Sequence, residues 1–80
     1  MKKIHIQYFA ILREQRGLSS ETVETRSNSA QELYGELQNK FRFTLPLKLV
    51  RVSINNEFKS LDTLLQDNDN IVFIPPVAGG

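Results

Sequence analysis

Cysteine and tryptophan are absent from this chain of 80 residues, and histidine occurs only once. Without cysteine the chain has no disulfide, no thiol nucleophile and no side chain that carries a persulfide. The single histidine, His5, leaves little scope for a self-contained acid–base site. We therefore expect a domain that is held together by packing alone, which suits the cytoplasm. Its chemistry should depend on a partner or on its own terminus.

Long apolar runs and a strong excess of one charge are missing as well. The longest apolar runs are far shorter than the roughly 20 residues that a membrane-spanning helix needs. The start, Met1-Lys2-Lys3, leads directly into alternating sequence, so we expect no secretory signal. Ten basic and nine acidic side chains give a formal net charge of +1, and the basic ones are scattered along the chain. Neither nucleic acid nor a membrane is an expected partner.

Hydrophobic periodicity predicts five strands and one long helix. Apolar and polar residues alternate over several short stretches, which is typical of strands. The expected strands are residues 3–9, 18–26, 48–55, 57–59 and 71–74. Ser29 and Glu32 have the spacing of a capping box, and apolar residues recur at helical spacing from there to Phe41. Shorter helical turns are expected over 10–16, ended by Gly17, and near 61–65.

This order of elements favours an α+β domain in which one main helix packs on a small sheet. The run Ile71-Val72-Phe73-Ile74 is the most apolar strand, so we expect it in the middle of the sheet. Asn55-Asn56 is a plausible tight turn because asparagine tolerates positive φ. Gly35 lies inside the helix, where a close approach to the sheet would explain it. Residues 1–74 should form the domain, and residues 75–80 an extended tail.

The tail, Pro75-Pro76-Val77-Ala78-Gly79-Gly80, is the most unusual stretch of the chain. The two prolines end the preceding strand and direct the chain outward. Glycine has no Cβ, so Gly79 and Gly80 can pass through a narrow slot. The strong chemical group at such a tip is the carboxylate of Gly80. The alternative is an ordinary frayed terminus.

Several motifs resemble the MoaD family, the small subunit of molybdopterin synthase, nearly from end to end. They are Tyr8-Phe9-Ala10 followed by Leu12-Arg13-Glu14 and Gly17, the hairpin at 52–57, Leu61-Asp62-Thr63, Asp67-Asn68-Asp69, and the ending at 75–80. The family often has glycine where Asn56 stands. The resemblance implies a β-grasp, ubiquitin-like fold with a mixed sheet of about five strands.

The resemblance also implies a function as a sulfur carrier. An E1-like, MoeB-like enzyme would use ATP to adenylate the Gly80 carboxylate, and a sulfur donor protein would convert the adenylate into a thiocarboxylate. The loaded tail would enter a MoaE-like large subunit, in a heterotetramer of two small and two large subunits. There, sulfur would pass to cyclic pyranopterin monophosphate and build the dithiolene of molybdopterin. This chain would bind no cofactor and would not be catalytic alone.

Strand parity predicts where the large subunit docks. If Ile4, Ile6 and Tyr8 face the helix, Phe9 lies on the opposite face, and the same reasoning places Ile74 there. With Phe58 they would form an apolar patch on a polar face, at positions that match the family's interface. The predicted partner-binding residues are Phe9, Arg13, Phe58, Ile74, Pro75, Pro76, Val77 and Ala78. Alternatively, Phe58 covers the core edge, Phe9 fills a local pocket and Arg13 is a plain surface charge.

The remaining candidates have ordinary interpretations. We expect His5 to be solvated or hydrogen-bonded, and Asp67 and Asp69 to shape a turn, since their spacing does not fit a metal loop. Three other functions stay open. The chain could be a ThiS-like carrier for thiamine or another thiolation pathway, a ubiquitin-like protein modifier, or a binding module with an accidental tail.

Overall fold

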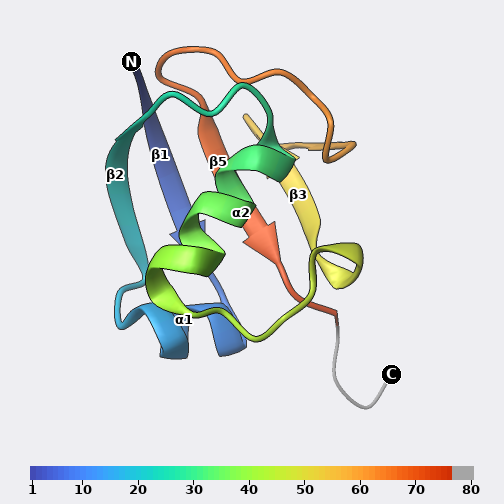
Figure 1. Ribbon diagram of the computed structural model, residues 1–80. Coiled ribbons are helices and arrows are strands. Elements are labelled where there is room, and N and C mark those ends of the chain that lie inside the picture. The colour runs from blue at the N-terminus through green and yellow to red at the C-terminus, as the bar shows by residue number, and fades with distance from the viewer. Residues whose placement is uncertain (77–80) are drawn as a thin grey trace.

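The computed structural model describes residues 1–76 of the chain (Figure 1). The elements in order are β1 Lys2–Tyr8, α1 Ala10–Arg16, β2 Ser20–Thr25, α2 Ala30–Phe41, the 3₁₀ turn η1 Leu47–Leu49, β3 Arg51–Ile54, β4 Glu57–Lys59 and β5 Asn70–Ile74. In Figure 1, α2 crosses one face of the sheet and α1 lies near the end of β1. No helix within residues 1–76 is long and apolar enough to cross a membrane.

The five strands form one mixed sheet in the order β2-β1-β5-β3-β4. β1 and β5 run parallel, and the other neighbouring strands run antiparallel. β5 therefore lies in the centre, as its apolar sequence predicts. Its alternation continues the core, because Ile71 and Phe73 are buried whereas Val72 and Ile74 are only partly so. This mixed sheet packed on one helix confirms the predicted α+β, β-grasp architecture.

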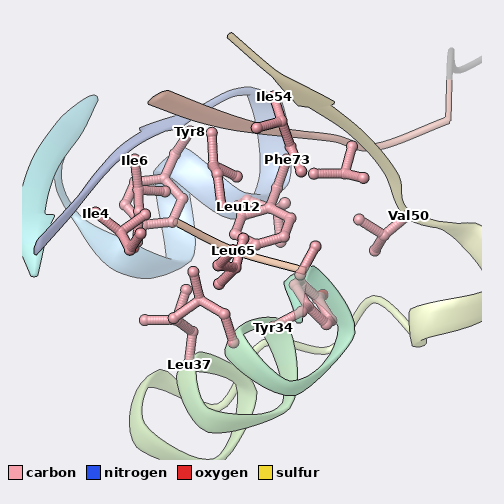
Figure 2. Close-up of a cluster of buried hydrophobic side chains, with 14 of the residues drawn as sticks. Ile4, Ile6, Tyr8, Leu12, Tyr34, Leu37, Val50, Ile54, Leu65 and Phe73 are labelled. Carbon is pink, nitrogen blue, oxygen red and sulfur yellow. The ribbon is translucent and has the colours of Figure 1, made fainter. Parts of the chain in front are cut away.

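The core lies between α2 and the sheet (Figure 2). Tyr34 and Leu37 of α2 point toward the inward side chains of β1, β3 and β5. The Tyr34 ring lies 5.3 Å from the Phe73 ring, centroid to centroid. Complete burial of one such side chain contributes about 1.5–3 kcal/mol. The strand that precedes the tail is thus fixed on its helix-facing side by the core.

α2 begins with the predicted capping box. The Ser29 hydroxyl accepts a 3.2 Å hydrogen bond from the N–H of Glu32, and the Glu32 carboxylate accepts one of 3.0 Å from the N–H of Asn28. The helix ends at Arg42, whose φ of 58° is left-handed. Gly35 does not approach the sheet, because a Cβ built on it would meet no atom within 4 Å. The close approach suggested for this glycine is therefore wrong.

Two sequence predictions fail in the segments between the regular elements. The strand expected over 48–55 begins only at Arg51, because Leu47–Leu49 forms a 3₁₀ turn after Pro46. The helical turn expected over 61–65 is also wrong. There the carbonyls of Leu61 and Thr63 accept hydrogen bonds from Gln31 and Ala30 at the start of α2, at 2.8 and 3.2 Å. The segment satisfies N–H groups that a helix start leaves without partners. It does so with a single turn at 61–62, closed by a 3.1 Å hydrogen bond from the N–H of Thr63 to the carbonyl of Ser60, followed by a bridge between Leu64 and Ser29.

Candidate functional site

The end of β5 is held firmly where the tail begins. Phe73 is fully buried and pairs with Tyr8 on one side and Val52 on the other, and Ile74 pairs with Arg51. Pro75 is partly buried and Pro76 is exposed. The strand is therefore paired on both edges up to Phe73, and on the β3 edge up to Ile74, the residue before the first proline. Val77, Ala78, Gly79 and Gly80 lie outside the described residues, so the roles predicted for them stay predictions.

Phe9 lies at the corner between β1 and α1. Its backbone is still extended, with φ −130° and ψ 154°, and its carbonyl accepts the first hydrogen bond of α1, from Leu12 at 3.1 Å. The next residue, Ala10, has a left-handed φ of 51°. A non-glycine residue adopts this conformation at a cost of about 1 kcal/mol, so tertiary contacts must hold the corner. The Phe9 side chain is 43% exposed.

Phe58 lies on the side of the sheet that α2 leaves uncovered, which we call the open face. It pairs with Ser53, which pairs with Val72, which pairs with Gln7. Residues opposite one another in a sheet point to the same side, so these four share the open face. Phe58 is 77% exposed, which rules out the alternative that it covers the edge of the core.

The apolar residues of the open face do not form the single patch that the sequence predicted, because polar or charged residues lie between them. β3 lies between β5 and β4, so Arg51 and Ser53 lie between Ile74 and Phe58. Val72 is an apolar member of this face that the sequence prediction missed, although strand parity places it with Ile74. The structure thus puts Phe58 and Ile74 on the predicted side, and their role as partner contacts stays a prediction.

Two hollows shape the open face. The smaller has a volume of about 370 Å³ and is lined by Arg51 and Phe58, with Val52, Lys59 and Ser60. The larger, of about 630 Å³, lies over β1, β2 and β5, and polar side chains such as Gln7 and Thr22 line much of it. Among residues 1–76, these hollows hold no buried side-chain polar atom without a hydrogen bond. Their shape suits contact with a partner surface more than enclosure of a small molecule.

A hydrogen-bonded network lies beneath the Phe9 corner. Arg16 donates two hydrogen bonds of 2.7 Å to the Glu21 carboxylate, and the hydroxyl of Tyr8 donates a third, also of 2.7 Å. The bonds from Arg16 hold the pKa of Glu21 below its usual value. Burial, together with the neighbouring Glu21, raises the pKa of Tyr8. The network joins α1 to β1 and β2 on either side of Phe9.

Arg13, by contrast, is exposed on α1, and its predicted contact with a partner stays a prediction.

The ordinary interpretations of the other polar candidates are confirmed. The Nδ1 atom of His5 lies 2.9 Å from the Thr22 hydroxyl. Asp67 accepts a 2.7 Å hydrogen bond from the N–H of Lys3, and Asp69 accepts one of 2.8 Å from the N–H of Gln66. Both carboxylates thus bind backbone N–H groups around the turn before β5, as predicted for turn-forming aspartates.

Comparison with known proteins identifies the family. The ThiS family model matches residues 6–80, which include the tail. The molybdopterin synthase sulfur carrier subunit of Mycobacterium tuberculosis is 34% identical over 83 aligned positions, which cover 100% of both chains. The chain belongs to the ThiS/MoaD family of ubiquitin-like sulfur carriers.

Solved structures agree with this membership in the ThiS/MoaD family. One chain of the complex between subunits 1 and 2 of the molybdopterin-converting factor from Helicobacter pylori is 26% identical. Its TM-score is 0.66, and the match covers 98% of this chain and 99% of that one. Small archaeal modifier protein 1 of Methanosarcina acetivorans has a TM-score of 0.79 at 24% identity, over 100% and 98% of the two chains. This second likeness shows the shared fold alone.

Proposed function

We propose that this ThiS/MoaD-family chain is the sulfur-carrier small subunit of molybdopterin synthase, in molybdenum cofactor biosynthesis. The observation that carries the proposal is the full-length similarity to the Mycobacterium tuberculosis subunit of that name. Because the family match extends to Gly80, the same comparison includes the tail on which the chemistry depends. The described residues contribute an ordered support for that tail, which leaves the central strand at Pro75.

The proposed reaction begins at the Gly80 carboxylate. A carboxylate oxygen is a poor leaving group, so it must first attack the α-phosphorus of ATP, which releases pyrophosphate and gives an acyl adenylate. The terminal sulfur of a persulfide on a donor protein then attacks the acyl carbon and displaces AMP, which gives an acyl disulfide. A thiol cleaves its S–S bond, so that a disulfide forms on the thiol side and the thiocarboxylate remains on Gly80. An E1-like enzyme supplies the activating site, and this chain supplies no catalytic side chain. Because activation consumes ATP, we place the carrier in the cytoplasm.

In the second half of the reaction the loaded tail delivers its sulfur. The acceptor is cyclic pyranopterin monophosphate, held by a MoaE-like large subunit in a heterotetramer of two small and two large subunits. Two loaded tails are needed for each product, because a dithiolene contains two sulfur atoms. A slender Gly79-Gly80 end suits a deep, narrow site. The Helicobacter pylori complex, which pairs subunit 1 with subunit 2, supports a partner of this kind.

The open face is the proposed docking surface for that subunit. Ile74 lies next to the start of the tail, Phe58 lies two strands away on β4 and is 77% exposed, and Phe9 lies at the corner before α1, 43% exposed. An apolar centre surrounded by polar groups is the common composition of a protein interface. Pro75 and Pro76 would continue this contact into the slot that receives the tail.

A second function has one observation in its favour. The TM-score to a small archaeal modifier protein, 0.79, is higher than the 0.66 to the chain of the Helicobacter pylori complex. A modifier would use the same adenylated Gly80, but a lysine amine of a target would displace AMP and form an isopeptide bond. A carrier for thiamine or another thiolation pathway would differ only in the protein that accepts the sulfur.

The test is intact mass spectrometry after incubation with ATP, the E1-like enzyme and a sulfur donor. A mass gain equal to the exchange of one oxygen for one sulfur at Gly80 supports a carrier. Adding the large subunit and cyclic pyranopterin monophosphate should then return the carboxylate and yield molybdopterin. An unchanged mass under conditions that load a known carrier would refute the proposal. Isopeptide adducts on other proteins would indicate a modifier.

A further inference from the structure

The fold separates charges that are scattered along the sequence. The end of the molecule at which β5 ends, which we call the tail end, also contains α1, the end of α2, η1 and the start of β3 (Figure 1). Contacts hold these segments together, since the Arg16 guanidinium lies 3.9 Å from the centre of the Phe41 ring and Gln15 donates a 2.8 Å hydrogen bond to Thr44. Five exposed basic residues lie here: Arg13, Lys40, Arg42, Lys48 and Arg51.

The acidic side chains gather at the opposite end. Within residues 1–76, the tail-end segments contain two acidic residues, Glu14 and Glu21, and Glu21 is paired with Arg16. Glu57 is paired with Lys59 at 3.2 Å on the edge strand. Three basic residues lie at the far end: Lys2, Lys3 and Arg26. The same end contains six acidic residues: Glu24, Glu32, Glu36, Asp62, Asp67 and Asp69. The net charge of +1 therefore conceals a strong asymmetry along the molecule.

The two groups of charges also differ in what they do within the fold. Several far-end carboxylates accept hydrogen bonds, as Glu36 does from Thr25 at 2.8 Å and from Ser27 at 3.0 Å. None of the five tail-end basic side chains takes part in a hydrogen bond or an ion pair within residues 1–76. Solubility alone would be served by charges at either end. Lys40 does lie over the Phe41 ring, 5.6 Å from its centre. Exposed charges of one sign gathered at one end, without hydrogen bonds or ion pairs of their own, point to a partner.

Two of the basic residues lie close to apolar side chains of the proposed docking surface. Arg51 pairs with Ile74, the last residue before the prolines, and lines the 370 Å³ hollow together with Phe58. Arg13 lies on α1, the helix that begins directly after Phe9. Arg51 lies between Ile74 and Phe58, so positive charge is interspersed with the apolar side chains where the tail begins. A partner that contacts these apolar side chains also meets positive charge, so its own surface there must be negative to avoid an unfavourable contact.

We propose that the tail end docks on an acidic protein surface around the slot that receives the tail, and that the charge asymmetry turns the carrier tail-first as it approaches. The occupant is the large subunit of the proposed function, on which this inference rests. Opposite potentials on two surfaces raise the association rate 10- to 1,000-fold at low salt. Nucleic acid fits less well, because apolar side chains occupy the centre of the surface where base or phosphate contacts would lie.

Matched charge reversals test the proposal in kinetics with the large subunit. Lys48→Glu with Arg51→Glu alters the tail end, and Lys3→Glu with Arg26→Glu alters the far end by the same net charge. At low salt the tail-end pair should slow association at least about tenfold, with a smaller change in dissociation. The far-end pair should leave association within about twofold or speed it, and added salt should reduce the difference between the pairs. Equal effects of the two pairs would overturn the proposal. Thermal unfolding checks that both variants fold.

A second measurement does not depend on the proposed function. Backbone amide signals of the wild-type chain are followed by NMR during titration with an oligoglutamate peptide and, separately, with a single-stranded DNA of equal charge. Peptide-induced shifts concentrated at Arg13 and residues 42–51 support an acidic protein partner, and shifts centred on Lys2, Lys3 and Arg26 overturn it. Tighter binding of the DNA would overturn it in favour of nucleic acid. If the peptide maps to the tail end but the large subunit does not bind, the proposed function fails while the acidic-partner surface stands.

Discussion

Arg16 and Glu21 connect α1 to β2 through two parallel hydrogen bonds of 2.7 Å between guanidinium and carboxylate. Tyr8 of β1 donates to the same carboxylate, and the Arg16 guanidinium also lies over the ring of Phe41 at the end of α2. One carboxylate thus unites the segments on both sides of Phe9. The left-handed Ala10 in this corner needs such support, because its backbone conformation is unfavourable on its own.

We expect Glu21→Gln to lower the free energy of unfolding by about 1–3 kcal/mol at pH 7, because the charge-assisted bonds are lost at a largely buried site. The pKa of Glu21 is held below its ordinary value of 4.5, so its contribution is present above that pH and is lost as the pH falls through the lowered pKa. The difference between wild type and variant should therefore shrink in acid. Urea unfolding at several pH values measures it. Glu24→Gln, an exposed change on the same strand, should have little effect at any pH.

Gly35→Ala should stabilise the protein by about 1 kcal/mol, because alanine is the better helix former and its Cβ would meet no atom within 4 Å. In a domain of this size the melting temperature should rise by roughly 4–8 °C. Gly17→Ala is the matched control. There the φ of +83° disfavours any side chain, so the melting temperature should fall although the space around it is empty. A loss of stability in Gly35→Ala would contradict the absence of a close contact.

Phe9→Lys should weaken binding to the large subunit at least about tenfold while leaving the melting temperature nearly unchanged. The reason is that Phe9 is 43% exposed at the proposed interface, whereas its neighbour Tyr8 is buried at 1% exposure. Surface plasmon resonance and thermal unfolding on the same preparation measure the two effects. Leu64→Lys, a comparably apolar and 71% exposed site away from the tail end, is the control and should bind normally. Unfolding of Phe9→Lys would show that Phe9 belongs to the core.

Deletion of Gly80 should abolish thiocarboxylate formation without a measurable loss of stability. The buried core extends along β5 to Phe73, and the deletion leaves every one of these core residues in place. Intact mass after the activation reaction reports the first effect and thermal unfolding the second. Adding one alanine after Gly80 should block sulfur loading as well, since it displaces the reactive carboxylate. A loaded deletion variant would place the chemistry elsewhere.

Local signals account for the elements that sequence reasoning located correctly. Gly17 ends α1 with a left-handed φ of 83°, and Asn55 and Asn56 form the hairpin turn with φ of 53° and 70°. Ser29 begins α2 because its hydroxyl accepts from an N–H only three residues away. Each of these features depends on the backbone preferences of one or two neighbouring residues, so it can be read from the sequence.

Segments whose backbone groups bond to distant partners could not be predicted in this way. Leu64 forms a bridge with Ser29, and the N–H of Leu65 donates a 2.8 Å hydrogen bond to the carbonyl of Asn28. These partners are more than thirty positions away, so the leucine spacing near 61–65 suggested a helix that the contacts with α2 exclude. Val72, by contrast, could have been predicted, because strand parity places it on the same face as Ile74.

The central strand of the sheet and the start of the main helix could be predicted from the sequence, because apolar runs and capping residues act locally. The Gly-Gly end likewise indicates where the proposed chemistry would take place. The tertiary structure alone decided which distant side chains meet. It joined Arg16 to Glu21 and Tyr8, and it gathered Arg13, Arg42, Lys48 and Arg51 around the point where the tail begins. Positions far apart along the chain become neighbours only when the strands pair, so this distribution of charge follows from the topology.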